Sequence, residues 1–157
     1  MPGTVYVETS VVSYLTARPS GNIVTRAHQQ LTHEWWDTRR RNFTLYTSQL
    51  VLQEAASGDP LMAEERLKLL EDLAALDISV EASTLARALL SAGAPPPRAP
   101  EDALHIAIAV VNGLEYLLTW NCRHIANAAM RRTIEQVCRD GGYEPTILCT
   151  PEELLDA

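Results

Sequence analysis

Short apolar runs alternate along the chain with longer stretches of helical character, and this alternation constrains the fold most. We expect strands at TVYV (4–7), FTLYTS (43–48), EYLLTW (115–120) and TILCT (146–150), with a weaker one at DISVE (77–81). Strands that alternate with helices are typical of a parallel sheet with helices on both faces. The sequence therefore predicts a three-layer α/β/α fold with a central, mostly parallel sheet of four to five strands.

The stretches between these strands carry helix signals. Thr9 or Ser10 is expected to cap the first helix, and Ser48 caps the helix after the second strand. Pro100 and Gly113 predict the start and the end of another helix. Further helices are expected over 21–41, 60–76, 82–93 and 122–142, with a short one after a capping box at 150–153.

Length and composition narrow the class of protein. The chain has 157 residues, 46% of them hydrophobic, so we expect one domain over residues 1–157 with its own core. No apolar run approaches the roughly 20 residues of a membrane helix, and we expect no signal peptide. The 3 cysteines lack Cys-x-x-Cys spacing, which is typical of free thiols in a cytoplasmic protein. The net charge of −7 disfavours nucleic-acid binding over the whole surface but not at a local basic patch.

Four polar residues stand where the predicted strands give way to helices. Glu8 follows the first strand and Glu54 lies on the helix after the second, while Asp102 opens a helix and Asn121 follows the fourth strand. Because the carboxyl ends of parallel strands meet at one edge, we expect these side chains to converge there. Carboxylates brought together repel unless a cation compensates them, and a hard divalent cation does so. We therefore expect Glu8, Glu54 and Asp102 to share a metal ion.

Each of these residues also has a plainer interpretation. Glu8 and Asp102 can each complement a helix dipole from a first turn. Glu54 can be an ordinary acid on a solvent face, although no Lys or Arg lies within 4 positions to pair with it. Asn121 is a favoured N-cap residue.

Four segments, taken in order, resemble the PIN-domain family, and within it the VapC-like bacterial ribonucleases that are the toxin halves of type II toxin–antitoxin pairs. The segments are VYVETSVVSYL, TSQLVLQEA, EDALHIAIA and YLLTWNCRHIANA, and the similarity spans nearly the whole chain. The resemblance implies a PIN-like parallel sheet with an acidic cluster that binds Mg²⁺ or Mn²⁺ and cleaves RNA. It also implies a homodimer and an antitoxin encoded beside this gene.

The resemblance assigns roles residue by residue. Glu8, Glu54 and Asp102 match the first three acidic positions and would be direct or water-bridged metal ligands. Thr119 matches the hydroxyl residue of the fourth motif and would hold a ligand in place. Asn121 matches a position of that motif that is often Asp, and would offer its side-chain oxygen or orient a water. The first acid is usually Asp, so Glu8 is one methylene longer than the family pattern.

Three further residues lie near the expected site. His105 follows Asp102 by three positions and can hydrogen-bond it, or can be an ordinary core histidine. Arg123 is the first choice for a contact with an RNA phosphate. Trp120 can stack on a base, and can equally pack against a neighbouring helix.

Two rival functions stay open. A catalytically degenerate PIN-fold module would bind RNA or a protein partner without cleaving it, which Asn121 and the negative net charge favour. Another metal-dependent phosphohydrolase would act on a small substrate. The segment HEWWD (33–37) lacks the second histidine of a zinc peptidase, and the chain has no dinucleotide-binding, P-loop or α/β-hydrolase motif.

Overall fold

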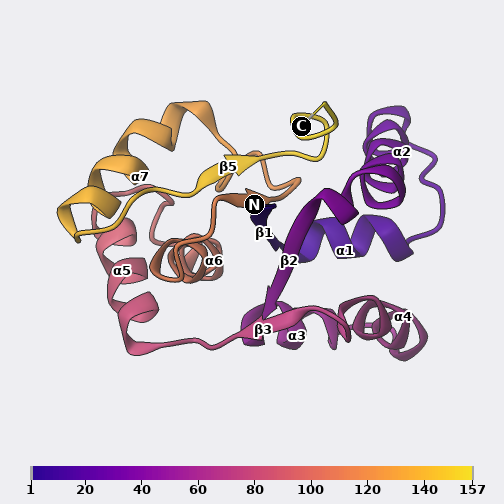
Figure 1. Ribbon diagram of the computed structural model, residues 1–157, viewed down its shortest axis with the longest axis horizontal. Helices are drawn as coiled ribbons and strands as arrows, with labels where there is room; N and C mark the ends of the chain where they lie inside the picture. The colour runs from indigo at the N-terminus through magenta and orange to yellow at the C-terminus, as the bar shows by residue number, and fades with distance from the viewer. Residues whose placement is uncertain (1, 157) are drawn as a thin grey trace.

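A five-stranded, all-parallel sheet in the order β3-β2-β1-β4-β5 runs through the molecule (Figure 1). The computed structural model describes residues 2–156. Its strands are β1 (Gly3–Val7), β2 (Phe43–Ser48), β3 (Ala74–Leu76), β4 (Tyr116–Leu118) and β5 (Ile147–Cys149). This architecture confirms the predicted three-layer parallel fold. The strand β1 occupies the centre, which brings its carboxyl end between those of β2 and β4.

Helices flank the sheet on both sides. In Figure 1, α5, α6 and α7 lie to the left of the sheet, and α1, α2 and α4 lie to its right. The helices are α1 (Thr9–Thr16), α2 (Ile23–Thr38), α3 (Gln49–Ala55), α4 (Pro60–Leu70), α5 (Val80–Ser91), α6 (Pro100–Val111) and α7 (Ala128–Asp140). Within the described residues, no helix is both long enough and apolar enough to cross a membrane.

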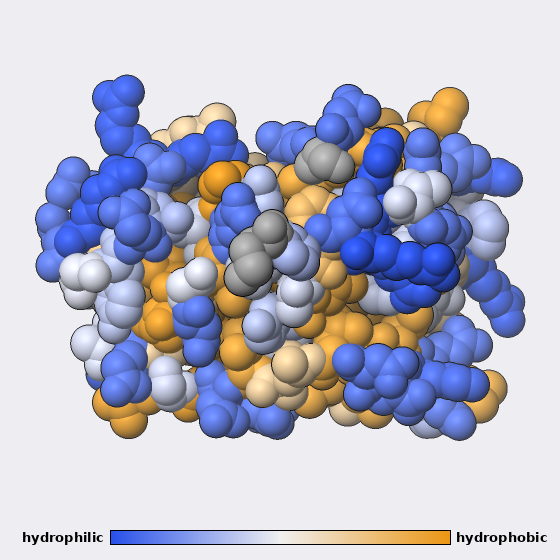
Figure 2. Space-filling model, in the orientation of Figure 1, coloured by the Kyte–Doolittle hydropathy of each residue, from blue (hydrophilic) through white to orange (hydrophobic). Residues whose placement is uncertain are grey.

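The core is built around β1 and α6. Val5, Tyr6 and Val7 are each 0% exposed. Every residue from His105 to Val110 on α6 is buried, as expected of a helix that is apolar almost all round. Figure 2 shows hydrophilic residues over much of one face, with hydrophobic ones gathered mainly towards its middle. The helix α6 is therefore buried along most of its length, and only its first turn and its last residue are partly exposed.

The structure corrects several expected element boundaries. The helix predicted over 60–76 ends at Leu70, and residues 74–76 form β3, because they pair with Tyr46–Ser48 of β2. The segment 77–81 forms no strand, since Ser79 caps α5 by accepting a hydrogen bond from the Ala82 N–H at 3.1 Å. The helix predicted over 122–142 begins only at Ala128, and residues 151–156 form turns instead of a helix.

Candidate functional site

Glu8 lies directly after β1 and is 6% exposed. Its Oε2 accepts a hydrogen bond from the Ser10 N–H at 3.1 Å, so Glu8 is the N-cap of α1 in place of the expected Thr9 or Ser10. Its Oε1 accepts from the Ser10 hydroxyl and the Thr119 hydroxyl, each at 2.5 Å. Three donors therefore compensate the burial of this carboxylate and fix its orientation.

Glu54 approaches the same edge of the sheet from α3, which Ser48 caps by accepting a hydrogen bond from the Val51 N–H. Its Oε1 accepts from the Thr9 hydroxyl at 2.5 Å and lies 2.8 Å from His105 Nε2. Burial alone raises the pKa of Glu54, but the hydrogen bond and electrostatic attraction of the His105 ring and the hydrogen bond of Thr9 outweigh it and lower the pKa. Glu54 is therefore an ionised carboxylate at neutral pH.

His105 bonds to Glu54 and not to Asp102, which was one of the two possibilities that the sequence left open. Its side chain is 1% exposed. Its Nδ1 lies 2.7 Å from the hydroxyl of Tyr6 on β1. Both ring nitrogens therefore have partners on other elements, and the spacing of three residues along α6 does not join His105 to Asp102.

Glu8, Glu54 and His105 form a set whose ligand atoms lie within 4.8 Å of one another. Within the described part of the chain, both donors to Glu54 bond to Oε1, which leaves Oε2 open. Carboxylate oxygens oriented in this way are the ligands that Mg²⁺ and Mn²⁺ prefer. The residues present therefore fit a divalent cation.

Asp102 lies outside this set, in a pair of its own. Its Oδ2 is 3.0 Å from Nδ1 of His124, and the two side chains are 23% and 16% exposed. The sequence analysis did not predict a role for His124. The only signal for one was its position three residues after Asn121. The structure thus brings Glu8 and Glu54 together and holds Asp102 in a neighbouring carboxylate–imidazole pair.

Thr119 and Asn121 connect these parts of the edge. Thr119 is 0% exposed, and its hydroxyl accepts a hydrogen bond from the Asn121 N–H at 2.9 Å while it donates to Glu8. The side-chain oxygen of Asn121 accepts from the His124 N–H at 2.9 Å. This bond holds a turn that precedes α7, and the N-cap of α7 is Asn127 and not Asn121, as the plainer interpretation of Asn121 had it.

Trp120 and Arg123 lie on the same stretch of chain but in different surroundings. The half-buried ring of Trp120 stacks on His28 of α2 with centroids 4.0 Å apart, and its Nε1 donates to Thr32 at 2.6 Å. The structure thus shows the helix packing that was one of its two interpretations. Arg123 is exposed.

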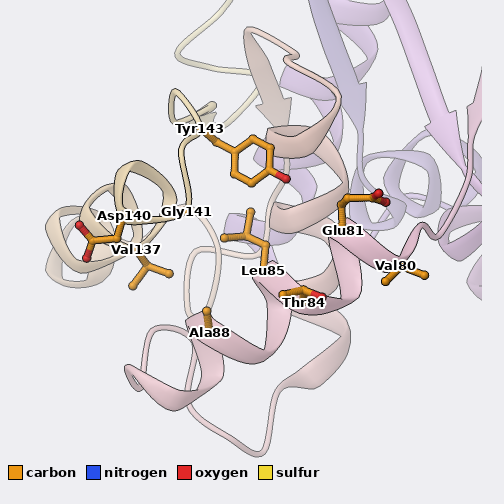
Figure 3. Close-up of a pocket in the computed structure, with 9 residues that line it drawn as sticks. All are labelled: Val80, Glu81, Thr84, Leu85, Ala88, Val137, Asp140, Gly141 and Tyr143. Atoms are coloured by element: carbon orange, nitrogen blue, oxygen red, sulfur yellow. The ribbon is translucent and has the colours of Figure 1, made fainter.

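A separate hollow of about 490 Å³ lies between α5 and α7 (Figure 3). Its lining includes the apolar side chains of Leu85, Val137 and Tyr143, with Glu81 and Asp140 at its rim. No residue of the acidic edge lines it. We therefore assign the chemistry to the edge of the sheet, where charged groups converge, and not to this hollow.

Comparisons with known proteins agree with this fold. Residues 5–129 match the sequence model of the PIN domain. No curated protein matches the chain. Among solved structures, the Sarcin-Ricin loop cleaving toxin VapC20 of Mycobacterium tuberculosis is 17% identical, with 72% of this chain and 86% of that chain covered and a TM-score of 0.55. VapBC2 from Rickettsia felis, in a structure bound to a promoter DNA fragment, is 16% identical. The match covers 94% of this chain and 98% of that chain, with a TM-score of 0.60. Identities this low show a shared fold.

Proposed function

The chain belongs to the PIN-domain family, and from that premise we propose that it is a metal-dependent ribonuclease that hydrolyses phosphodiester bonds in RNA. The observation that carries the proposal is the convergence of Glu8 and Glu54 at the carboxyl edge of the sheet, with ligand atoms within 4.8 Å of each other. Hydroxyl groups already fix both carboxylates, so little reorganisation is needed before they act.

We propose that Glu8 and Glu54 hold Mg²⁺ or Mn²⁺, and that Asp102 joins them directly or through a water. When bound, the ion lowers the pKa of water and stabilises charge on phosphoryl oxygens. Thr119 orients Glu8, and Asn121 orients the turn that carries His124.

RNA contacts belong to the same proposal. The exposed guanidinium of Arg123 binds a phosphate close to the acidic residues. Trp120, a partly exposed residue next to the acidic edge, stacks on a base.

We further propose that the protein is a cytoplasmic toxin, neutralised by an antitoxin, and that it forms a homodimer. The similarity of fold to VapBC2 over 94% of this chain supports the proposal that an antitoxin is its partner. Expression of the chain alone should arrest bacterial growth, and co-expression with the product of the neighbouring reading frame should relieve the arrest and yield a complex that co-purifies. Light scattering on the purified chain checks the dimer.

Cleavage of RNA by the purified chain, with Mg²⁺ or Mn²⁺ and then with a chelator, tests the enzyme. Asp102→Asn and Glu54→Gln should each lower the rate at least about a hundredfold, the upper end of the effect of removing a residue behind a metal ligand. Glu101→Gln is the matched control, because Glu101 is the exposed neighbour of Asp102 on α6. Cleavage that survives both site variants would contradict the proposed site.

Two other outcomes would redirect the proposal. Tight RNA binding without cleavage at any metal concentration would favour the degenerate binding module. Metal-dependent hydrolysis confined to small phosphoesters would favour the phosphohydrolase.

A further inference from the structure

Tyr6 lies behind the acidic site, on the central strand, and belongs to none of the roles assigned above. We propose that Tyr6 and Ser48 are positioning residues that hold His105 in the form that donates a hydrogen bond to Glu54. In that role His105 supports the metal site without binding the ion. The inference rests on the proposed function only for the role of Glu54 as a metal ligand.

The contacts form one continuous chain of hydrogen bonds. The Val51 N–H lies 3.1 Å from Ser48 Oγ, which lies 2.8 Å from Tyr6 Oη. Tyr6 Oη lies 2.7 Å from His105 Nδ1, and His105 Nε2 lies 2.8 Å from Glu54 Oε1. Tyr6 and Ser48 are 0% exposed and His105 is 1% exposed. Each proton in this chain must therefore find its acceptor inside the protein.

Counting protons along the chain sets the direction of every bond. The Glu54 carboxylate can only accept, so the proton between it and His105 belongs to Nε2. A ring protonated on both nitrogens would donate to Tyr6, turn the Tyr6 hydroxyl towards Ser48 and leave the Ser48 proton without an acceptor. Nδ1 is therefore an acceptor, and the Tyr6 hydroxyl donates to it. Tyr6 in turn accepts from the Ser48 hydroxyl, which accepts from the Val51 N–H. Every hydrogen bond then contains one proton, and no donor is left without a partner.

A metal ion on Nε2 of His105 reverses this arrangement. The imidazole would carry its proton on Nδ1 and donate to Tyr6, and Tyr6 would donate to Ser48. The Ser48 hydroxyl proton would then lack an acceptor among the contacts of this buried residue. A buried donor without an acceptor is costly, and Glu54 would also lose its bond to His105. The geometry therefore favours His105 as a donor over His105 as a ligand.

Nitrogen-15 NMR of the metal-free protein tests the inference directly, with His105→Gln used to assign the imidazole signals. We expect the proton on Nε2 and none on Nδ1. Tyr6→Phe should shift His105 towards a mixture of the two tautomers, because Nδ1 loses its donor. Tyr46→Phe is the matched control, since Tyr46 pairs with Tyr6 in the β1–β2 register but lies outside the hydrogen-bond chain. A wild-type proton on Nδ1 would overturn the inference, whether or not any variant folds.

Mn²⁺ binding provides a second readout. Electron spin-echo modulation on the Mn²⁺-loaded protein should show no nitrogen of His105 bound to the ion. Tyr6→Phe should weaken Mn²⁺ binding by about tenfold, the lower end of the range for residues behind a ligand. His105→Gln, whose amide can still donate to Glu54, should bind Mn²⁺ more tightly than His105→Leu. A nitrogen signal that disappears in His105→Gln would overturn the inference. If the wild type binds no metal at all, that result counts against the proposed function, and the NMR experiment then decides the inference.

Discussion

Thr119 Oγ1 lies 2.5 Å from Glu8 Oε1, and this buried bond joins the residue after β4 to the residue after β1. The same hydroxyl accepts the Asn121 N–H at 2.9 Å. One side chain therefore orients the first acid of the site and anchors the turn that carries Asn121 and His124. The two halves of the acidic edge depend on each other through this residue.

Thr119→Val keeps the shape of the side chain and removes both hydrogen bonds. We expect the free energy of unfolding to fall by about 1–3 kcal/mol, because a half-buried N–H and a buried carboxylate each lose a partner. We expect Mn²⁺ affinity to fall about 10- to 100-fold, because Glu8 is no longer held in place. Urea denaturation and titration calorimetry measure the two effects. Thr44→Val, at an exposed position of β2, should change neither, and an unchanged Mn²⁺ affinity in Thr119→Val would argue against Glu8 as a ligand.

The lowered pKa of Glu54 predicts a dependence of stability on pH. A carboxyl group whose pKa is lower in the folded state stabilises the fold above its ordinary pKa of 4.5, and this contribution is lost as the pH falls through the folded value. Glu54→Gln should therefore be less stable than the wild type at neutral pH, and the difference should shrink as the pH falls below 4.5.

Urea midpoints across this pH range measure the effect of Glu54. Glu64→Gln, at an exposed acid on α4, provides the control for loss of one negative charge. A difference between wild type and Glu54→Gln that stays constant with pH would show that Glu54 draws no stability from its ionised form.

Hydrophobic runs and capping residues predicted correctly those elements whose boundaries depend on residues within the element itself. FTLYTS forms the strand Phe43–Ser48, and Ser48 caps the next helix, as its side chain and position indicate. The strand β3 was missed because its residues, AAL, are good helix formers, and only pairing with Tyr46–Ser48 makes them extended. The predicted meeting of acids at one edge depended on the strands being parallel, which the alternation of strands and helices predicts.

The partners of the histidines could not be predicted in the same way. His105 and Asp102 are three residues apart on α6, and this spacing allowed either a bond between them or an ordinary core histidine. The structure instead pairs His105 with Glu54, and Asp102 with His124. Which side chain an imidazole meets depends on its rotamer and on packing between elements far apart in sequence. The spacing of residues along the sequence gives neither the rotamer nor the packing.

The three cysteines should differ sharply in reactivity. Burial, assisted by nearby Glu135, raises the pKa of Cys138 to about 11, and burial, assisted by Glu153, raises that of Cys149 to about 12. Both remain thiols at mildly alkaline pH. Partial burial and Glu153 also raise the pKa of Cys122, but Cys122 is exposed and open to a reagent. Iodoacetamide should therefore modify Cys122 alone in the folded protein and all three after denaturation, as read by mass spectrometry.

Cys122→Ser is the control for this experiment, and it should show no rapid labelling when folded. Rapid modification of Cys138 or Cys149 in the native protein would mean that the region around α7 or β5 opens far more readily than its packing indicates.

Arg123 offers a test of the RNA-binding surface that is independent of catalysis. It is exposed in the turn between Asn121 and α7, so Arg123→Ala should leave the free energy of unfolding unchanged within about 0.5 kcal/mol. If its guanidinium binds a phosphate, the variant should bind RNA more weakly and the slope of log affinity against log salt should fall by about 0.7–0.9. Fluorescence anisotropy with a labelled RNA in the presence of a chelator measures binding without cleavage.

Arg87→Ala, at an exposed position of α5, removes the same charge and should preserve the slope. Arg123→Lys should keep the slope but lose the affinity that comes from a bidentate contact between the guanidinium and a phosphate. Equal slopes for Arg123→Ala and the wild type would place the RNA phosphates elsewhere on the molecule.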